Sequence, residues 1–386
     1  MSHRRQRTII VVAAIALVAA VSAGYFLTGE KYEKHTDSML DVFDTVITLV
    51  AYTKDEAEFD RYYDYAYDRL HQLHKLYDFY NSYDGINNIV TVNRNAGKAP
   101  VEVDEDVIGM LLFAKGLAES TGGRTNIAMG SVLRIWHEFR EEGINDPENA
   151  RIPDMSDLKE AARHTDIEKM VIDEEAGTVY LEDPMMSLDV GAVAKGYATE
   201  LVAKELAEMG MSSGIISSGG NIRAIGKPMD GIRQRWGVGI QDPDKSVFLE
   251  SDEDLLDVVY INDGAVASSG DYQRYYIVDD KIYHHIIDPE TLMPADYYRA
   301  VTVLTDDAGL ADFMSTALFL LPLEKSRELA GDMGVEAYWV LPNGRKDATD
   351  GMLKSLRSMG VSMVSDYVTD SVDNSSAKMS CNRAWE

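Results

Sequence analysis

Residues 46–77 carry the most regular pattern of apolar and polar positions in the chain. A β-branched run over 46–52 predicts a strand. Thr53 and Glu56 then match a T-x-x-E capping box, so we expect a helix to begin there. Spacings of three and four between apolar residues predict its buried face, formed by Phe59, Tyr63, Ala66, Leu70, Leu73 and Tyr77.

Further elements follow from the same kind of pattern. Helical spacing of apolar residues predicts helices over 106–119, 194–210 and 310–321. Shorter apolar runs predict strands over 214–217, 236–241, 282–287, 300–304 and 336–341. Strands and helices are mixed without a regular βαβ period, which favours an α+β fold over a doubly wound sheet or a barrel.

The N-terminus indicates export. Arg4, Arg5 and Arg7 precede an uncharged stretch over 8–27, which as a helix would span about 30 Å, the thickness of a membrane's hydrocarbon core. Basic residues ahead of such a stretch keep the short N-terminus inside. The small residues VSA at 21–23 also resemble a cleavage site, so a removed signal peptide is the alternative to a retained anchor. Either way, we expect the rest of the chain outside the cytoplasmic membrane.

Composition suggests how the two ends are organised. We predict a membrane anchor or signal peptide over 1–29 and a short polar spacer over 30–37. From residue 361 the chain is rich in serine and aspartate and has little periodicity, which predicts a flexible polar tail over 361–386.

Charge and cysteine content exclude several classes of function. The chain has 65 acidic and 37 basic residues, a formal net charge of -28, which repels nucleic acid and anionic lipid. We therefore expect no nucleic-acid partner. Cys381 is the only cysteine, which excludes an intrachain disulfide and a multi-cysteine metal site. Chemistry must therefore come from oxygen and nitrogen groups.

One segment has the composition of a phosphate-binding helix start. In DVGAVAKGY at 189–197, which begins with Asp189, small residues let the backbone approach a ligand just before a predicted helix. The N-terminal amides of a helix favour anions, and Lys195 stands at the helix entrance. Taken alone, the segment is better explained as a helix start with an exposed lysine.

Two glycine-containing segments resemble each other. SSGGN at 217–221 places Gly219 and Gly220 in a tight turn after a strand, where backbone N–H groups can face a ligand. SSGDY at 268–272, with Ser269 and Gly270, repeats this chemistry. An ordinary tight turn has the same composition, but two such turns carry more weight than one.

The remaining chemistry lies in a histidine pair and in the last predicted helix. His284 and His285 point to opposite faces if their segment is a strand, so they cannot chelate one ion together. One of them is a candidate general base, although a solitary histidine is more often structural. Asp312 and Thr316 lie four apart on one helix face and offer oxygen ligands to a hard cation such as Mg²⁺. A plain helix-surface pair is the alternative.

Five segments in this order resemble the ApbE family, the FAD:protein FMN transferases. They are DVGAVAKGYA, SSGGNIRAIG, ASSGDY, HHIIDP and ADFMSTAL, and the resemblance covers residues 39–352. It implies one ApbE-like catalytic unit over 38–360 with the FAD site in a cleft. It also implies Mg²⁺-dependent flavinylation outside the cytoplasmic membrane.

The resemblance assigns roles to particular residues. It implies metal ligation, by Mg²⁺ or Mn²⁺, through the Ala192 carbonyl, Asp312 and Thr316. Ser315 stands where some members have an aspartate. The implied contacts to FAD, together with the glycine-rich turns, are Phe43, Tyr83, Gly123, Arg124, Thr125, Asp189, Lys195, Gly219, Gly220, Ser269, Gly270 and Ile286. The chain departs from the family's F-D-x-T pattern at Thr125 and Asn126, and from its early M-G-T at residues 43–45.

The implied reaction moves FMN from FAD to a threonine or serine hydroxyl of another protein and releases AMP. Lys195 would offset phosphate charge and His285 would act as the base. The implied acceptor is an exported or membrane redox protein, such as subunits of Rnf- or Nqr-type complexes or other extracytoplasmic electron-transfer proteins. Two alternatives stay open: an FAD pyrophosphatase that yields FMN and AMP, and an exported flavin-binding protein without turnover.

Overall fold

The computed structural model describes residues 31–245 and 254–364. The predicted anchor or signal peptide over 1–29 and the part of the predicted tail from residue 365 onward lie outside this description. Within the described ranges, no helix combines the length and the apolarity that crossing a membrane requires.

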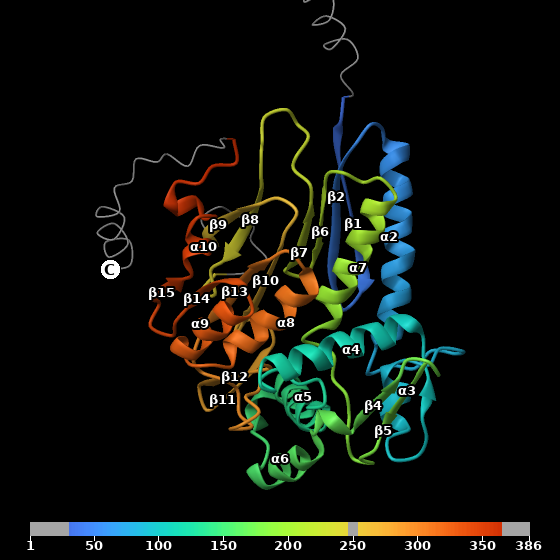
Figure 1. Ribbon diagram of the computed structural model, residues 1–386. Helices are drawn as coiled ribbons and strands as arrows, with labels where there is room; N and C mark the ends of the chain where they lie inside the picture. Colours follow the sequence, from blue (N-terminus) through green and yellow to red (C-terminus); the bar gives the residue numbers. More distant parts are fainter. Residues whose placement is uncertain (1–30, 246–253, 365–386) are drawn as a thin grey trace, which may run out of the picture.

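An antiparallel sheet of eight strands organises the molecule (Figure 1). The predicted strands over 46–52, 214–217, 300–304 and 336–341 are all confirmed as members of it. In spatial order the strands are β1 (Glu33–Val42), β2 (Thr45–Thr53), β6 (Gly214–Ser218), β7 (Asn221–Ile225), β10 (Ala265–Gly270), β13 (Ala300–Thr305), β14 (Glu336–Val340) and β15 (Lys346–Ala348).

Helices cover one face of this sheet. They are α2 (Glu56–Tyr77), α7 (Ala194–Glu208), α8 (Ala308–Phe319) and α9 (Leu323–Asp332) (Figure 1). Alternate side chains of β2 point toward this layer, because successive residues of a strand face opposite sides. Ile47 and Leu49 are therefore buried in one cluster with Leu70 and Leu73 of α2.

The opposite face of the sheet is also covered. Trp339 of β14 belongs to the core under the helices, whereas its neighbour Tyr338 lies in a second buried cluster on the other side. There it joins Trp236 of β8 (Trp236–Gln241) and Val259 of β9 (Leu255–Ile261), which form a separate two-stranded sheet. The short helix α10 (Asp350–Leu353) and a 3-10 turn, Arg357–Met359, complete this layer.

A smaller part of the molecule lies below the large sheet in Figure 1. In it, two paired strands over 275–278 and 281–284 pack on the helix over 130–145 through Trp136, Tyr276 and Tyr283. Its elements are α3 (Ile89–Arg94), β3 (Val101–Glu102), α4 (Glu105–Ser120), α5 (Gly130–Asn145), α6 (Met155–Ala161), β4 (Met170–Asp173), β5 (Thr178–Leu181), β11 (Tyr275–Val278) and β12 (Lys281–His284), with short 3-10 helices at Pro147–Asn149, Ala162–His164 and Ile167–Lys169.

The predicted cap of α2 was placed two residues too early. Asp55 is the N-cap, and its carboxylate accepts a hydrogen bond from Glu58 N at 2.8 Å. The Glu58 carboxylate in turn accepts from Lys54 N at 2.8 Å. The D-x-x-E pair therefore replaces the predicted T-x-x-E pair, since aspartate is as good an N-cap as threonine or better.

One side chain of the predicted helix face is also different. Tyr62 is buried, whereas Tyr63 is only partly covered. The Tyr63 hydroxyl donates to Ser38 O at 3.2 Å, so this ring lies at the border of the core, where its polar end can reach the backbone of β1.

The polar spacer predicted over 30–37 is wrong from Glu33 onward. β1 starts at this residue, and Glu33 pairs with Thr53 of β2. β1 is the edge strand and pairs only with β2, and seven of its ten residues are exposed. Its sequence therefore lacks the apolar alternation by which a strand is recognised.

Three other boundaries differ from the predictions. Ser268 and Ser269 belong to strand β10, not to a turn, and β12 ends at His284, three residues before the predicted end. At the start of the predicted tail, Met363 O accepts hydrogen bonds from Gln234 N and Arg235 N. Residues 361–364 therefore pack on a loop of the folded body.

Helices α7 and α8 approach each other closely at Gly196. A Cβ at this position would lie 2.4 Å from Ala308 O and 2.4 Å from Asp312 Cβ. No side chain fits in this contact, so glycine is required by space and not by backbone conformation.

We expect Gly196→Ala to lower the free energy of unfolding by about 1–3 kcal/mol, the usual cost of overpacking a filled core. Urea denaturation of the full chain would measure it. Gly116→Ala is the matched control, because Gly116 is an exposed helical glycine with open space around it, and alanine should stabilise α4 by up to about 1 kcal/mol. Equal stability of the Gly196→Ala protein and the wild type would contradict the close packing.

Candidate functional site

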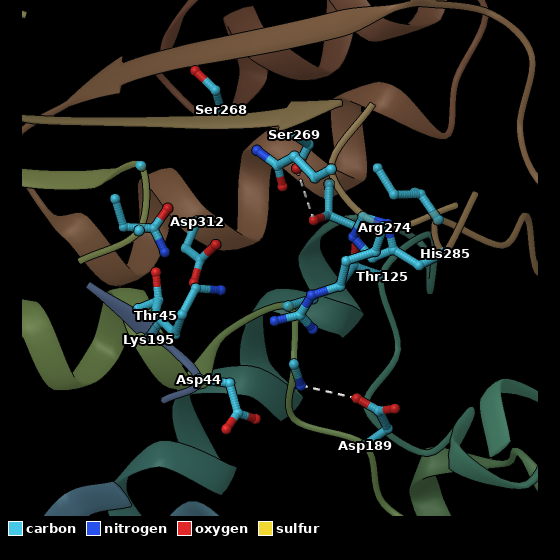
Figure 2. A pocket seen from close by; sticks show the side chains of 18 of the residues that line it. Asp44, Thr45, Thr125, Asp189, Lys195, Ser268, Ser269, Arg274, His285 and Asp312 are labelled. Atoms are coloured by element: carbon cyan, nitrogen blue, oxygen red, sulfur yellow. Dashed lines mark hydrogen bonds between the residues drawn. The ribbon is translucent and has the colours of Figure 1, made fainter. Parts of the chain in front are cut away.

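A cavity of about 740 Å³ opens between the large sheet and the smaller part of the molecule. Its walls come from the start of β2, the N-terminus of α7, the β6–β7 turn, β10, α5, α8 and the segments around Arg274 and His285. Figure 2 shows Lys195, Asp312, Arg274 and His285 around this space. Its volume lies in the range of small-molecule sites.

Oxygen atoms gather where α7 meets α8. Gly196 N donates to Asp312 Oδ2 at 2.9 Å, so the backbone of α7 occupies one of the two oxygens of this carboxylate. Burial raises the pKa of Asp312, and the nearby Lys195 ammonium and the Gly196 amide partly offset this rise. One turn along α8, the Thr316 hydroxyl lies 3.2 Å from that of Ser269.

This group of oxygens has the chemistry of a hard-cation site. The Asp312 carboxylate, the Thr316 hydroxyl and the backbone at Ala192 line the same cavity. In the described part of the chain, no three acidic, histidine or cysteine side chains gather as a ready-made metal cluster. A cation held here would have one carboxylate and would complete its shell with water or ligand oxygens, as Mg²⁺ commonly does.

Ser315 takes no part in this oxygen group as a ligand. Its hydroxyl donates to Asp312 O at 2.9 Å and lies 2.8 Å from the Ser269 hydroxyl. Ser315 is therefore buried in contacts that fix α8 on β10.

Basic side chains outnumber acidic ones in the cavity wall, although the chain as a whole carries a formal charge of -28. The lining has four cationic side chains and three carboxylates. Such a local reversal of sign favours an anionic ligand. The cations are Lys195, Arg124, Arg140 and Arg274, and the carboxylates are Asp44, Asp189 and Asp312.

Of these groups, Asp189 and Arg124 are held by other parts of the wall. Asp189 Oδ1 accepts from Gly191 N at 2.9 Å, which shapes the turn before α7. Burial raises the pKa of Asp189, and Arg274 and Arg140 oppose the rise. Arg124 forms an ion pair with Glu290 at 2.6 Å.

The two imidazole rings lie in different surroundings, in agreement with their predicted opposite orientations. His284 is fixed by its surroundings, because Nε2 lies 2.7 Å from Ala295 O and Nδ1 accepts from Ile286 N at 3.2 Å. His285 lines the cavity, and its Nδ1 is buried without a hydrogen-bond partner in the described residues. Burial lowers the pKa of His285 to about 3, helped by the cations Arg274, Arg140 and Lys195 and by His284.

Aromatic rings form another part of the wall. Phe79 and Tyr80 lie 4.4 Å apart between ring centroids, and Tyr80 lies 5.1 Å from His137. Trp136 of α5 lines the same side. Such planar faces can hold a flat heterocycle.

Most of the predicted site residues meet in this one cavity. They come from segments far apart in the sequence, which supports the expectation of a single cleft. The predicted residues that line the cavity are Arg124, Thr125, Asp189, Ala192, Lys195, Gly219, Gly220, Ser269, His285, Ile286, Asp312 and Thr316.

Four predicted contacts lie outside the cavity lining. The Phe43 ring packs edge-on against His74 of α2, with 5.4 Å between centroids. The Tyr83 hydroxyl donates to Asp78 Oδ2 at 2.8 Å, so this ring is held away from the cavity. Gly123 lies in a turn, and its neighbour Arg124 lines the cavity in its place. Gly270 is the last residue of β10 and lies against the Tyr272 ring.

The structure also brings in residues that were not singled out from the sequence. Phe79 and Tyr80 occupy the aromatic position expected of Tyr83, and Asp44 and Thr45 line the wall beside Phe43. Asn221 lines the cavity, and its side chain faces Asp312 and helps to offset the rise in the pKa of that carboxyl. It ends the SSGGN motif, so the sequence did contain a signal for it. No sequence signal pointed to Arg140 and Arg274, because single arginines are common on protein surfaces.

Because folding keeps His285 neutral, we expect a pH-dependent contribution to stability. The unfolded chain protonates this residue near its ordinary pKa of about 6.5, whereas the folded pKa is about 3. Between these values the unfolded state binds the additional proton. Stability should therefore fall as the pH falls, by at most about 1.4 kcal/mol per pH unit.

Two measurements check this expectation. NMR of the imidazole should show a neutral ring in the folded protein at pH 5. Urea denaturation at pH 7 and pH 5 should show a smaller loss for His285→Gln than for the wild type. A ring that titrates near pH 6.5 in the folded protein would contradict the buried, cation-flanked position.

Comparison with known proteins assigns a family to this site and fold. The ApbE family model matches residues 43–339. The FAD:protein FMN transferase of Treponema pallidum (strain Nichols) is 32% identical over 291 residues, which cover 72% of this chain and 76% of that protein. A FAD:protein FMN transferase of Klebsiella pneumoniae (strain 342) is 30% identical over 241 residues, covering 62% and 70%.

Solved structures agree with the family model. The crystal structure of the ApbE protein from Thermotoga maritima has a TM-score of 0.71 and 27% identity, covering 84% of this chain and 99% of that one. The Pseudomonas stutzeri flavinyl transferase ApbE has the same fold, with a TM-score of 0.69 and 22% identity over 86% and 98% of the two chains. From the matched span and these relatives, we conclude that this chain belongs to the ApbE family.

Proposed function

We propose that this chain transfers the FMN part of FAD to a threonine or serine hydroxyl of another protein and releases AMP. One observation carries the proposal. A single cavity joins the oxygen group of Asp312 and Thr316, the Lys195 ammonium and the neutral ring of His285. The family relatives that bear the name FAD:protein FMN transferase support it.

The cavity suits a dinucleotide in both of its chemical parts. The pyrophosphate of FAD is anionic, and the cationic wall of Lys195, Arg140 and Arg274 would offset that charge. The flat rings of FAD would find area against Phe79, Tyr80 and Trp136 at small entropic cost.

The reaction is a phosphoryl-type transfer. The acceptor hydroxyl oxygen forms a bond to the FMN phosphorus while the bond from that phosphorus to the bridging oxygen breaks, and AMP leaves with the electron pair. The proton of the acceptor hydroxyl passes to the ring of His285, which is neutral and therefore able to accept it. Positioning and charge neutralisation account for most of the acceleration in such chemistry.

The low pKa of His285 depends on the charge state of the cavity. In the free protein, burial and the cations around it hold the pKa near 3, which makes the ring a weak base. A bound pyrophosphate would bring negative charge beside the same cations and raise this pKa. Substrate binding would thereby strengthen the base where it is needed.

The Asp312 carboxylate, the Thr316 hydroxyl and the Ala192 carbonyl are the groups that would hold Mg²⁺, with Mn²⁺ as the other candidate. When bound, the ion neutralises charge on the phosphate oxygens. Lys195 lies beside Asp312 and adds a fixed positive charge from the protein.

We further propose that the acceptor is an exported or membrane redox protein, such as an Rnf- or Nqr-type subunit. The proposal that the catalytic unit works outside the cytoplasmic membrane is supported by the basic and then apolar sequence over 1–29. Mass spectrometry of the exported proteome, with and without this chain, would identify any protein whose flavin mass depends on it.

Incubation of the full chain with FAD, Mg²⁺ and that acceptor tests the activity. Transfer leaves a flavin mass on the acceptor and yields AMP. An FAD pyrophosphatase would yield FMN and AMP without modified protein, and a flavin-binding protein without turnover would yield no AMP. Either of these last two results would overturn the proposal.

Asp312→Asn should lower the transfer rate at fixed Mg²⁺ by at least about 100-fold, more than the usual cost of losing a group that only orients a metal ligand. Rates would be read from AMP release. Asp306→Asn is the control, because Asp306 is an exposed carboxylate just before α8. Similar rates in the two variants would remove Asp312 from the mechanism.

His285→Ala should retain FAD binding and slow transfer by about 10²- to 10⁴-fold, the usual contribution of general-base catalysis. Binding would be followed by flavin fluorescence and transfer by single-turnover mass spectrometry. Unchanged single-turnover transfer would show that another group accepts the proton.

A further inference from the structure

Two hydrogen bonds join α7 and α8, and they are related to each other. Gly196 N donates to Asp312 Oδ2 at 2.9 Å, and Ala308 N donates to Glu200 Oε2 at 2.8 Å. Gly196 and Glu200 lie four residues apart on α7, as Ala308 and Asp312 do on α8. Each helix therefore supplies a carboxylate that satisfies a first-turn N–H of the other, a group that has no partner within its own helix.

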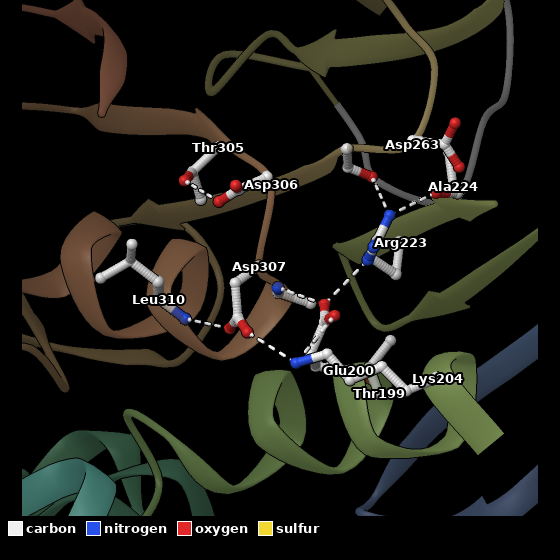
Figure 3. A network of polar contacts seen from close by, with 12 residues as sticks. Thr199, Glu200, Lys204, Arg223, Ala224, Asp263, Thr305, Asp306, Asp307 and Leu310 are labelled. Carbon is white, nitrogen blue, oxygen red and sulfur yellow. Dashed lines mark hydrogen bonds and ion pairs between the residues drawn. The ribbon is translucent and has the colours of Figure 1, made fainter. Parts of the chain in front are cut away.

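Glu200 is buried, with 4% of its surface exposed, and it is surrounded by donors. Its Oε2 also accepts from Arg223 Nε at 2.8 Å, and its Oε1 lies 3.4 Å from Lys204 Nζ. A carboxylate this deep is costly unless it is paired and hydrogen-bonded. Figure 3 shows how these partners converge on it from α7, from β7 and from the start of α8.

The same network reaches the N-terminus of α8 and the strand that follows the cavity-lining residue Asn221. Lys204 Nζ also contacts Asp307 Oδ2 at 3.2 Å, and Asp307 caps α8 through Leu310 N at 3.0 Å. Arg223 stands two residues after Asn221, which lines the cavity. Glu200 thus connects three elements that carry parts of the site, although it does not line the cavity itself.

A single contact would not fix the orientation of α8. At Gly196 the two helices touch with no room for a side chain, so this point is a pivot. The bond from Ala308 to Glu200, one helical turn away, is a second contact that restrains the angle between the helices. Thr316 lies one turn beyond Asp312 on the other side of the pivot, so a small rotation would move its hydroxyl relative to Ala192. Metal ligands tolerate only small displacements.

We propose that Glu200 is a positioning residue for the cation site: it holds α8 at the angle that brings Asp312 and Thr316 to Ala192. This inference rests on the proposed function, because it assigns Glu200 to the cation that the function requires. Glu200 acts through α8 and touches neither substrate nor cation.

Glu200→Gln tests the proposal with little change in shape. The glutamine oxygen can still face Ala308 N and Arg223, but an uncharged oxygen makes weaker hydrogen bonds than a carboxylate, and the amide nitrogen faces the Lys204 ammonium. The bond that holds α8 is therefore weakened. We expect Mn²⁺ binding to the full chain, measured by electron paramagnetic resonance without FAD, to weaken by about 10- to 100-fold. The Mg²⁺ concentration for half-maximal transfer should rise by a similar factor, with a smaller change in kcat at saturating Mg²⁺.

Lys204→Ala is the matched control. Lys204 is largely exposed and contacts the other oxygen of Glu200, so its loss leaves the bonds to Ala308 and Arg223 in place. We expect its Mn²⁺ affinity to equal that of the wild type. A loss as large as that of Glu200→Gln would show that any change to the network, and not the bond to α8 in particular, weakens the site, and would overturn the proposal.

Ala308→Pro provides a second variant in case Glu200→Gln does not fold. Proline is tolerated at the first helical position. It removes the N–H that Glu200 accepts and directs its ring toward that carboxylate, so Glu200 must move away from α8. Asp307, with φ -126° and ψ 126°, already has the backbone conformation that precedes proline. Circular dichroism would confirm folding, and Mn²⁺ affinity should fall as in Glu200→Gln. Because Ala308→Pro leaves every charge in place, a loss in Glu200→Gln alone would show that charge, and not the bond to α8, governs the site, and would overturn the proposal.

The outcomes separate this inference from the proposed function. If the wild type transfers FMN and binds Mn²⁺, and a folded Glu200→Gln or Ala308→Pro protein binds Mn²⁺ equally well, the role of Glu200 is overturned and the function stands. If the wild type binds Mn²⁺ and the variants do not, but no acceptor is flavinylated, the positioning role stands and the function fails.

Discussion

The hydrogen bond from Gly196 N to the Asp312 carboxylate is the contact on which the site depends. It joins residues 116 positions apart in the sequence and forms only because glycine lets the two helices touch. The contact buries Asp312 and uses one of its oxygens. It also places the Lys195 ammonium, one residue before Gly196, beside the same carboxylate. The same interaction therefore packs the two helices together and forms part of the proposed cation site.

The cations that line the cavity have two opposing effects. An anionic ligand favours clustered cations, and Arg140, Arg274 and Lys195 supply them inside an acidic protein. Burial and the same cations lower the pKa of His285. An anion bound in the cavity would offset the cations that disfavour the imidazolium. Ligand binding and protonation of His285 would then be coupled.

Much of the fold and site could be predicted from the sequence, and the misses have physical causes. Segments such as SSGGN and ADFMSTAL combine a turn or helix signal with a chemical group in a few residues, so each can be recognised locally. β1 was missed because seven of its ten residues are exposed and only Met39 and Val42 are buried, so it has no apolar alternation. α5 does carry a helix signal, because Val132, Trp136 and Phe139 recur at spacings of four and three and pack in one cluster, so the sequence could have predicted this helix.

The aromatic and cationic walls were harder to predict than the oxygen group. Tyr83 was expected in the cavity from its distance to a motif, yet Phe79 and Tyr80 are there, because the Tyr83 hydroxyl is bound to Asp78. Spacing along the chain does not determine which of several neighbouring rings faces a cavity. Arg140 and Arg274 lie on elements that meet only through tertiary packing, so their partnership around His285 has no local sequence signal.

The way the cavity is assembled has a thermodynamic consequence. Its wall begins at Asp44 and ends at Leu320 in the sequence and draws on both parts of the molecule, so no partly folded fragment contains it. Any ligand of this cavity should therefore bind the native state and not the unfolded chain. By mass action, a ligand at about 100 times its dissociation constant then adds about 2.7 kcal/mol to the free energy of unfolding. Ligand binding and folding are thus linked equilibria, so a supply of ligand would also protect the protein from degradation.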